Sequence, residues 1–335
     1  MVHNIYQGMG LSRVVNASGR VTKLGVSTIS DRVASAAVAG AQSYVVIDDL
    51  IDRAGKMIAA HTGAEDACPT SCASAAIAMS VAGLITKGKW TAVARMPDST
   101  GMANEIVLQK GHSIDYGAPM PTMIRLGGGV PVEAGTANEV HPEDIEEAIT
   151  DKTVALLYVK SHHCVQKGMV GIEAMRDIAH RHELPFVVDA AAEEDFRKYI
   201  ALGADLVCYS GAKALEATTS GFVCGREELI GYVKKQYRGI GRAMKVGKEQ
   251  IAGLLEALGQ YEEIDHGARA EKNKEAAGYL VEKIEAISGL SATLIQDIWA
   301  RTEFLNLGMI DFDPRPLVQG DKELIVGKLE KIMGE

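Results

Sequence analysis

The sequence predicts an α/β fold, in which a large, mixed but mostly parallel sheet is covered by helices on both faces. Three continuous apolar runs, at residues 153–160, 184–190 and 204–210, have the length and the β-branched content of fully buried strands. A helical segment at residues 173–182 separates the first two runs. Strands that alternate with helices in this way are typical of right-handed parallel crossover units.

Other segments before residue 225 extend the alternation. Residues 65–72 are predicted to form a strand that leads into a turn, and the Ala-rich residues 74–86 to form a helix. The peptide VPVEA at 130–134 has the pattern of a short strand. Residues 141–144 (HPED) open a helix, because acidic residues in the first turn interact favourably with the helix macrodipole. Residues 221–224 form the last predicted strand.

The pattern changes to long helical segments after residue 225. We expect helices over 226–238 and 248–288, then a strand-like piece from Leu290 and a terminal helix. A length of 335 residues is typical of two domains, and the change of pattern places the boundary near 245–265. The predicted domains are a large domain, 1–250, with an N-terminal segment, 1–60, and a small α+β domain, 251–335.

Composition excludes several classes of protein. Against 35 Lys and Arg there are 44 Asp and Glu, a net charge of −9, which argues against a general nucleic-acid binder. The apolar stretch at 68–86 is interrupted by Pro and Ser, and residues 1–10 lack a signal pattern, so we expect a cytoplasmic protein without a membrane span. Five cysteines without CxxC spacing predict neither a disulfide framework nor a metal site.

Two chemically notable residues follow predicted strands. Asp189 ends the strand of residues 184–190, and Lys213 lies in the turn after the strand of residues 204–210. Carboxyl ends of parallel strands are where open α/β sheets bind ligands. Asp189 alone is equally explained as a helix N-cap, and Lys213 alone as a loop lysine that reaches solvent. Together they match an aldehyde-binding lysine and a ring-nitrogen carboxylate for pyridoxal 5′-phosphate.

A turn of small residues precedes the Ala-rich helix. Cys72, Ala73 and Ser74 are small enough for a phosphate to approach the backbone, and a helix N-terminus offers free N–H groups. A plain Ser N-cap is the simpler explanation of this turn taken alone. The turn of Cys72, Ala73 and Ser74, then Asp189 and then Lys213 nevertheless occur in the same chain order as the corresponding parts of the aspartate-aminotransferase-type (fold type I) pyridoxal-phosphate fold.

Several segments resemble one family. Residues 14–19 (VVNASG), 111–117, 133–138 and, most specifically, 188–199 (VDAAAEEDFRKY) and 208–225 (CYSGAKALEATTSGFVCG) are similar to the L-seryl-tRNA selenium transferase family. Within it they look most like the D-glucosaminate-6-phosphate ammonia-lyase branch. True selenium transferases carry an additional N-terminal tRNA-binding domain.

The resemblance implies a lyase that uses pyridoxal phosphate to release ammonia from a phosphorylated amino sugar acid, by α-proton abstraction and β-elimination. It implies a homodimer or higher homo-oligomer with active sites near the interface, and neither nucleic acid nor membrane as a partner. Two rivals stay open: a selenium or sulfur transferase on aminoacyl-tRNA, and a non-catalytic relative of the fold. By resemblance Lys213 is the Schiff-base lysine, Asp189 the partner of the ring nitrogen and Ser210 a phosphate ligand. The other expected cofactor contacts are Cys72, Ala73, Ser74, His112 and Ala191.

Three histidines are further candidates. His112 is predicted either to stack on the cofactor ring or to bond to the backbone. His162 and His163 follow the strand of residues 153–160, so one of them is a candidate acid for a departing hydroxyl. Because adjacent side chains of an extended chain face opposite ways, we expect at most one of the two to act.

Four residues are candidates for substrate binding. Arg242 and Lys248 belong to a basic cluster before a long helix, where a solvated basic face is the ordinary interpretation. Arg315 lies in a segment (DPR) that resembles the family, and a guanidinium matches a carboxylate bidentately. Asn16 lies in the VVNASG segment.

The join of Asp297 to Ile298 departs from the family pattern. Flanking segments there resemble family segments that are normally separated by a few dozen residues, and only Asp297 is suited to a tight turn. We expect that a loop is absent from this point, and that it covers the substrate as a lid.

Overall fold

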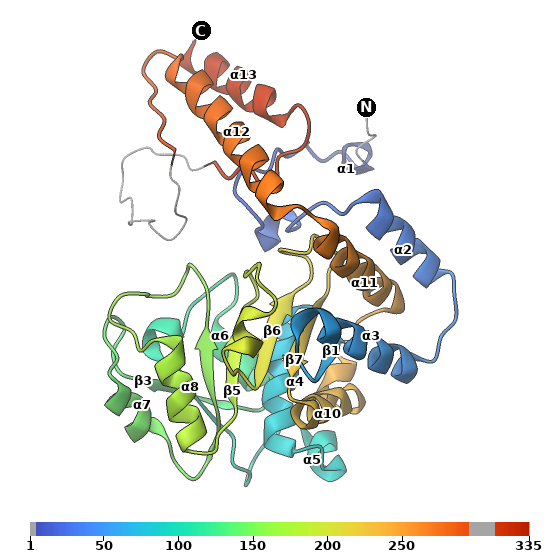
Figure 1. The fold of residues 1–335 in the computed structure, drawn as a ribbon, viewed down its shortest axis with the longest axis vertical. Coiled ribbons are helices and arrows are strands. Elements are labelled where there is room, and N and C mark those ends of the chain that lie inside the picture. Colours follow the sequence, from blue (N-terminus) through green and yellow to red (C-terminus); the bar gives the residue numbers. More distant parts are fainter. Residues whose placement is uncertain (1–4, 295–311, 335) are drawn as a thin grey trace. The chain divides into compact units, whose positions relative to one another are not determined.

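The computed structural model describes residues 5–294 and 312–334 (Figure 1). Two compact units are present. The larger is Ile29–Glu262, and the smaller combines the described residues of Met1–Thr28 and Glu263–Glu335. Within the described ranges, no helix has the length and apolar character needed to cross a membrane.

The larger unit is built on one seven-stranded sheet, as the sequence predicts. Its strand order is β1-β7-β6-β5-β4-β2-β3, and only β7 runs antiparallel to its neighbours. This is the expected mixed, mostly parallel sheet. Its strands are β1 (Asp66–Thr70), β2 (Glu105–Gln109), β3 (Val130–Ala134), β4 (Thr153–Val159), β5 (Phe186–Asp189), β6 (Leu206–Ser210) and β7 (Gly221–Gly225).

Helices surround the sheet, and most of them follow the predicted alternation (Figure 1). β2 and the helices α2, α3, α5 and α6 have no counterpart among the predicted elements. The helices of this unit are α2 (Asp31–Ala41), α3 (Ile47–Thr62), α4 (Ala73–Thr86), α5 (Trp90–Arg95), α6 (Met120–Leu126), α7 (Pro142–Ala148), α8 (Ile172–Arg181), α9 (Lys198–Ala201), α10 (Glu227–Lys235) and α11 (Lys248–Glu263). Short 3-10 turns are η2 (Lys110–His112), η3 (Gln236–Arg238) and η4 (Ile240–Arg242).

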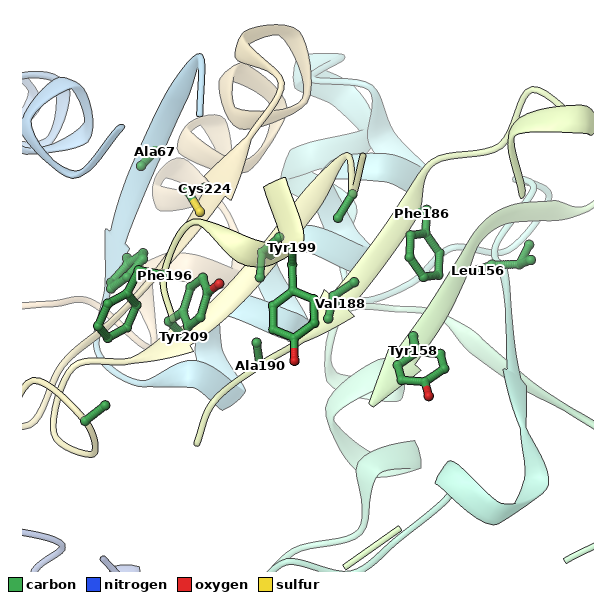
Figure 2. Close-up of a cluster of buried hydrophobic side chains, with 14 of the residues drawn as sticks. Ala67, Leu156, Tyr158, Phe186, Val188, Ala190, Phe196, Tyr199, Tyr209 and Cys224 are labelled. Atoms are coloured by element: carbon green, nitrogen blue, oxygen red, sulfur yellow. The ribbon is translucent and has the colours of Figure 1, made fainter. Parts of the chain in front are cut away.

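Both faces of the sheet are buried, which explains why its strands have continuous apolar sequences. In β4, Leu156 and Tyr158 join one core cluster, whereas Ala155, Leu157 and Val159 join the other. The first cluster contains the aromatic side chains drawn in Figure 2. The second contains seven of the 14 residues of α4, a helix rich in small apolar residues.

The smaller unit is helical in its described part. It comprises α1 (Ile5–Gly8), η1 (Thr22–Leu24), α12 (His266–Glu285) and α13 (Asp321–Met333). Leu280 and Ile284 of α12 pack on Ile325 and Val326 of α13 to form its core. The α+β character expected for this unit is not seen among the described residues, because 290–294, the start of the predicted strand, pair with no other strand.

The division between the two units falls after Glu262, within the predicted range of 245–265 although beyond the predicted bound of 250. The chain before Ile29 belongs to the smaller unit, whereas the prediction places residues 1–60 with the large domain. Val15 and Ala17 pack against that unit's core, and the N–H of Asp313 donates to the Ala17 carbonyl at 2.6 Å. Sequence periodicity does not report such long-range contacts.

The predicted helix over 248–288 is two helices. α11 ends at Glu263, and Asp265 caps α12 by accepting a hydrogen bond from the N–H of Ala268 at 3.0 Å. An Asp side chain favours this arrangement because it satisfies a free N–H of the new helix. The join of Asp297 to Ile298, where we expect a loop to be absent, lies outside the described residues.

Candidate functional site

Asp189 and Lys213 come together at one edge of the sheet. Asp189 ends β5, where it pairs with Cys208 of β6, and Lys213 lies in the turn directly after β6. Asp189 is only 6% exposed, and its Oδ1 accepts a hydrogen bond from the N–H of Ala191 at 3.1 Å. No described residue donates to the other oxygen, Oδ2. This edge is therefore chemically unusual, since a buried carboxylate is normally fully hydrogen-bonded.

Burial and mutual attraction set the charges of this pair. Burial raises the pKa of Asp189 to about 6, although the N–H of Ala191 and the charge of Lys213 oppose the shift. Burial lowers the pKa of Lys213, and Asp189 opposes that shift. The two groups act on each other through their charges and form no ion pair within the described chain. A lysine with a lowered pKa is a better nucleophile and base near neutral pH.

The predicted phosphate turn is present at the N-terminus of α4. Cys72 is the N-cap, and its Sγ accepts a hydrogen bond from the N–H of Ala75 at 3.4 Å. The N–H groups of Ala73 and Ser74 have no acceptor in the part of the chain that the structure describes. Ser74 is also the single residue of α4 that is not buried. Free N–H groups at a helix N-terminus suit an anion.

Ser210 lies next to this turn. It ends β6 and pairs with Gly221 of β7. A Cβ on Gly221 would lie 2.5 Å from the carbonyl carbon of Cys72 and 2.7 Å from the nitrogen of Ala73. Only glycine permits this approach, which brings Ser210 beside the turn that contains Cys72.

A loop rich in acidic residues follows Asp189, and three tyrosine hydroxyls hold it. Tyr199 donates to the Glu193 carboxylate, Tyr209 to the carbonyl of Asp195 at 3.3 Å, and Tyr261 to the carbonyl of Glu194 at 2.6 Å. Tyr199 and Tyr209 belong to the buried aromatic cluster drawn in Figure 2. The loop that supplies Ala191 to Asp189 is therefore fixed by the core.

His112 adopts the backbone-bonded arrangement, one of its two predicted roles. Its Nδ1 accepts a hydrogen bond from the N–H of Val159 at 3.3 Å, and its ring meets Tyr158 edge to face at 4.5 Å between centroids. The residue is 1% exposed, so protein atoms cover the ring. Burial lowers the pKa of His112 to about 4, helped by the charge of Lys160. This arrangement supports the backbone-bonded interpretation over stacking on a cofactor.

His162 and His163 lie in a turn after β4, not in an extended chain. The N–H of Cys164 donates to the Ser161 carbonyl at 3.2 Å, and the Cys164 thiol donates to the carbonyl of Val159. The two imidazole rings lie on the same side, 3.9 Å apart, and both residues are exposed. The expectation that they face opposite ways is wrong, because the turn rotates one side chain onto the other.

The predicted substrate-binding residues fall into different surroundings. Arg242 ends η4, is exposed, and has no ion-pair partner among the described residues. The ammonium group of Lys248 donates to the carbonyls of Ala41, at 2.7 Å, and Ser43, and lies over the ring of Tyr44. Lys248 therefore holds the end of α2 in this structure, instead of presenting its charge to a ligand.

Asn16 and Arg315 belong to the smaller unit and stabilise turns there. The Asn16 side chain accepts from the N–H of Ser18 and donates to the Gly19 carbonyl, both at 3.0 Å. Arg315 donates to both oxygens of Asp313, at 2.6 to 3.1 Å. A Cβ on Gly19 would lie 2.6 Å from Asp313 Oδ2, so these residues form one cluster.

Comparisons with known proteins show the family of this chain. The family profile for L-seryl-tRNA selenium transferase matches residues 14–277. The chain belongs to this family. The D-glucosaminate-6-phosphate ammonia lyase of Salmonella typhimurium is 45% identical over 367 residues, which cover 99% of this chain and 98% of the relative. The 5′-C-glycyluridine monooxygenase-decarboxylase of a Streptomyces species is 39% identical and covers 98% of this chain and 92% of its own length.

Solved structures extend the comparison. A structure of D-glucosaminate-6-phosphate ammonia-lyase matches with a TM-score of 0.92 and 44% identity, over 100% of this chain and 99% of that chain. Aspartate aminotransferase from Thermus thermophilus matches with a TM-score of 0.54 and 18% identity, over 84% of this chain and 75% of that chain. This second likeness shows the fold, which is the predicted fold type I.

Sequence reasoning missed two residues of this family member's site. Tyr116 Oη lies 3.2 Å from Ser74 Oγ, and the N–H of Lys160 donates to the carbonyl of Asp189 at 2.8 Å. Lys160 directly follows β4, a position that the strand pattern marks as the ligand-binding edge. Tyr116 follows β2 by seven residues, and no local pattern connects it to the helix it meets. The described residues contain no cluster of three or more metal-ligating side chains.

Proposed function

We propose that this chain is a pyridoxal 5′-phosphate-dependent ammonia-lyase that converts D-glucosaminate 6-phosphate to 2-keto-3-deoxygluconate 6-phosphate and ammonia. The observation that carries the proposal is the buried pair of Asp189 and Lys213 beside the free N–H groups of Ala73 and Ser74. The similarity to the Salmonella enzyme, at 45% identity over nearly the whole chain, supports the choice of substrate.

The residues present fit this cofactor. Asp189 has an oxygen without a donor in the described chain, which suits the protonated nitrogen of a pyridine ring. Lys213 is a partly buried amine with no hydrogen bond or ion pair to a described residue, which suits the aldehyde. The N-terminus of α4, with Ser74 and the neighbouring Ser210, suits the phosphate. When bound, the cofactor supplies an electron sink for the charge that develops at the substrate's α-carbon.

Each side chain then has a defined task. The Lys213 amine takes the α-proton, which its lowered pKa favours. Asp189 keeps a negative charge next to the ring nitrogen and so holds the proton there. Departure of the 3-hydroxyl needs a proton, for which the exposed pair of His162 and His163 is the candidate donor.

Elimination and hydrolysis balance without an external reductant or oxidant. The substrate loses its α-proton and its 3-hydroxyl as water, and the released enamine becomes an imine. Water then adds to the imine carbon, and ammonia leaves.

To bind the substrate's anionic groups we propose the cationic residues Arg242 and Arg315, with Asn16 beside the Asp313–Arg315 pair. Lys248 is the weakest candidate, because backbone carbonyls already accept its hydrogen bonds.

We propose in addition a homo-oligomer with active sites near the interface. The connection between α2 and α3 supports this, because Tyr44 is fully exposed and Val46 is 63% exposed. Consecutive exposed apolar residues are typical of interaction surfaces. Light scattering on the purified protein tests this part separately, and a monomer at all concentrations would contradict it.

The function is tested with the purified protein reconstituted with pyridoxal 5′-phosphate. D-glucosaminate 6-phosphate should give equal amounts of ammonia and 2-keto acid, and the same acid without its phosphate should react far more slowly. The reaction is run with and without oxygen, because the Streptomyces relative is a monooxygenase. Product formation that requires oxygen, or a protein that takes up no cofactor, would contradict the proposal.

A further inference from the structure

Ser74 has an unusual place in α4. Every other residue of this helix is buried, so its hydroxyl marks the point where the helix opens to the cofactor site. Its Oγ lies 3.2 Å from the hydroxyl of Tyr116. Ser74 precedes β2 in the sequence, and Tyr116 follows it. This contact is the only hydrogen bond of the Ser74 side chain within the described residues.

The loop that carries Tyr116 is held in one conformation. The N–H of Met120 donates to the Ile114 carbonyl at 2.9 Å, and the N–H of Gly117 donates to Asp115 Oδ1 at 2.7 Å. Gly117 has a φ of +106°, which a residue with a side chain rarely adopts. Met120 is fully buried, so the loop is anchored where α6 begins. The Tyr116 hydroxyl is thus placed by backbone contacts, not by chance.

Tyr116 also lies within electrostatic reach of the other cofactor residues. Burial raises the pKa of Tyr116 to about 12; the hydrogen bond to Ser74 opposes this shift, and the charge of Asp189 adds to it. The hydroxyl is therefore protonated at neutral pH and available as a donor. A protonated phenol beside a serine hydroxyl can donate to the serine oxygen.

We propose that Tyr116 is a positioning residue for the cofactor's phosphate. Its hydroxyl donates to Ser74 Oγ, and the Ser74 proton is thereby directed towards the anion at the N-terminus of α4. Hydrogen bonds in such a chain strengthen one another, so the phenol improves the serine as a donor without touching the phosphate. This inference rests on the proposed function, because it assumes that a phosphate-bearing cofactor binds here.

The test compares binding of pyridoxal 5′-phosphate and of pyridoxal to the cofactor-free protein. Tyr116→Phe keeps the ring and removes the hydroxyl. It should weaken pyridoxal 5′-phosphate binding by roughly 3- to 10-fold, the factor expected for one neutral hydrogen bond. Pyridoxal, which lacks the phosphate, should bind Tyr116→Phe and the wild type equally. Tyr232→Phe is the matched control, because that hydroxyl bonds to Glu228 on the surface of α10 and should not affect either ligand.

Ser74→Ala provides the second measurement. If Tyr116 acts through Ser74, the double variant should bind pyridoxal 5′-phosphate as weakly as Ser74→Ala alone. Equal losses for both ligands in Tyr116→Phe, additive losses in the double variant, or no loss at all would each overturn the inference. Failure of the wild type to bind pyridoxal 5′-phosphate would instead overturn the proposed function, so the two failures are distinguishable.

Discussion

Asp189 and Lys213 act on each other through space without forming an ion pair. Each favours the charged form of the other, while burial opposes both charges. Their backbones are brought together by adjacent parallel strands, β5 and β6, so their relationship depends on the register of the sheet. The predictions below begin with this pair.

Lys213 is expected to be the lysine that carries the cofactor. Lys213→Ala should abolish both turnover and the link that borohydride reduces, because Lys213 is the partly buried amine whose pKa burial lowers and on which Asp189 acts electrostatically. Mass spectrometry of the reduced, digested protein locates the link. Lys160→Ala is the control, and it should still carry the link at Lys213. A modified peptide that contains Lys160 in the wild type would contradict the assignment.

Asp189→Asn is expected to reduce turnover severely while it preserves shape. The amide cannot hold the ring nitrogen protonated by charge, so about 3–4 kcal/mol of transition-state stabilisation should be lost. Steady-state kinetics with saturating cofactor measures this. The role of Asp189 would be refuted by near wild-type turnover in this variant.

The pKa of Asp189 also predicts how stability depends on pH in the cofactor-free protein. Its folded-state pKa of about 6 exceeds the ordinary value of 3.8, so its contribution to stability is present below about pH 4 and lost as the pH rises to 6. Asp189→Asn removes this loss and should be more stable than wild type at pH 8 by about 2–3 kcal/mol. Urea unfolding at pH 4 and pH 8 measures the difference, which should vanish at pH 4.

His112 should give a pH dependence of opposite sign. Its folded-state pKa of about 4 lies below the ordinary 6.5, so its contribution to stability is present above pH 6.5 and lost as the pH falls to 4. In His112→Gln, this loss of stability at acid pH should be absent. The slope of stability against pH between 4 and 6 should therefore become more negative. An unchanged slope would show that the buried imidazole does not titrate as its surroundings imply.

One of the two adjacent histidines is expected to be the acid in the elimination. Either His162→Gln or His163→Gln should lower kcat by about 10²-fold or more, the ordinary range for a general acid. The other variant should retain most activity and serves as the matched control, because both residues are exposed in the same turn. Full activity in the double variant would exclude both.

Arg315 has two possible tasks that one experiment separates. It pairs with Asp313, whose side chain is 11% exposed, so Arg315→Ala should destabilise the protein by roughly 1–3 kcal/mol. If it also contacts substrate, Arg315→Lys should raise KM with a smaller loss of stability, since lysine keeps the charge but not the bidentate geometry. Unchanged KM in a stably folded Arg315→Lys variant would limit Arg315 to a structural role.

The sequence by itself determined six of the seven strands of the sheet and the residues that follow them, with β2 as the exception. Apolar runs such as 153–160 identify strands buried on both faces, and the polar residue that follows such a run, Asp189 or the Lys213 turn, lies at the ligand-binding edge by the geometry of parallel strands. The small residues before α4 likewise indicate that a phosphate can approach the backbone closely, because only small side chains leave the helix N-terminus open.

Tertiary structure alone decided what those residues meet. Tyr116 reaches Ser74, Lys248 holds the end of α2, and residues before Ile29 pack with the smaller unit. None of these contacts has a local sequence signal, because each joins segments whose separation is fixed by packing and not by periodicity. The turn after β4 is a similar case, in which a backbone hydrogen bond turned His162 and His163 to one side against the extended geometry that their spacing predicts.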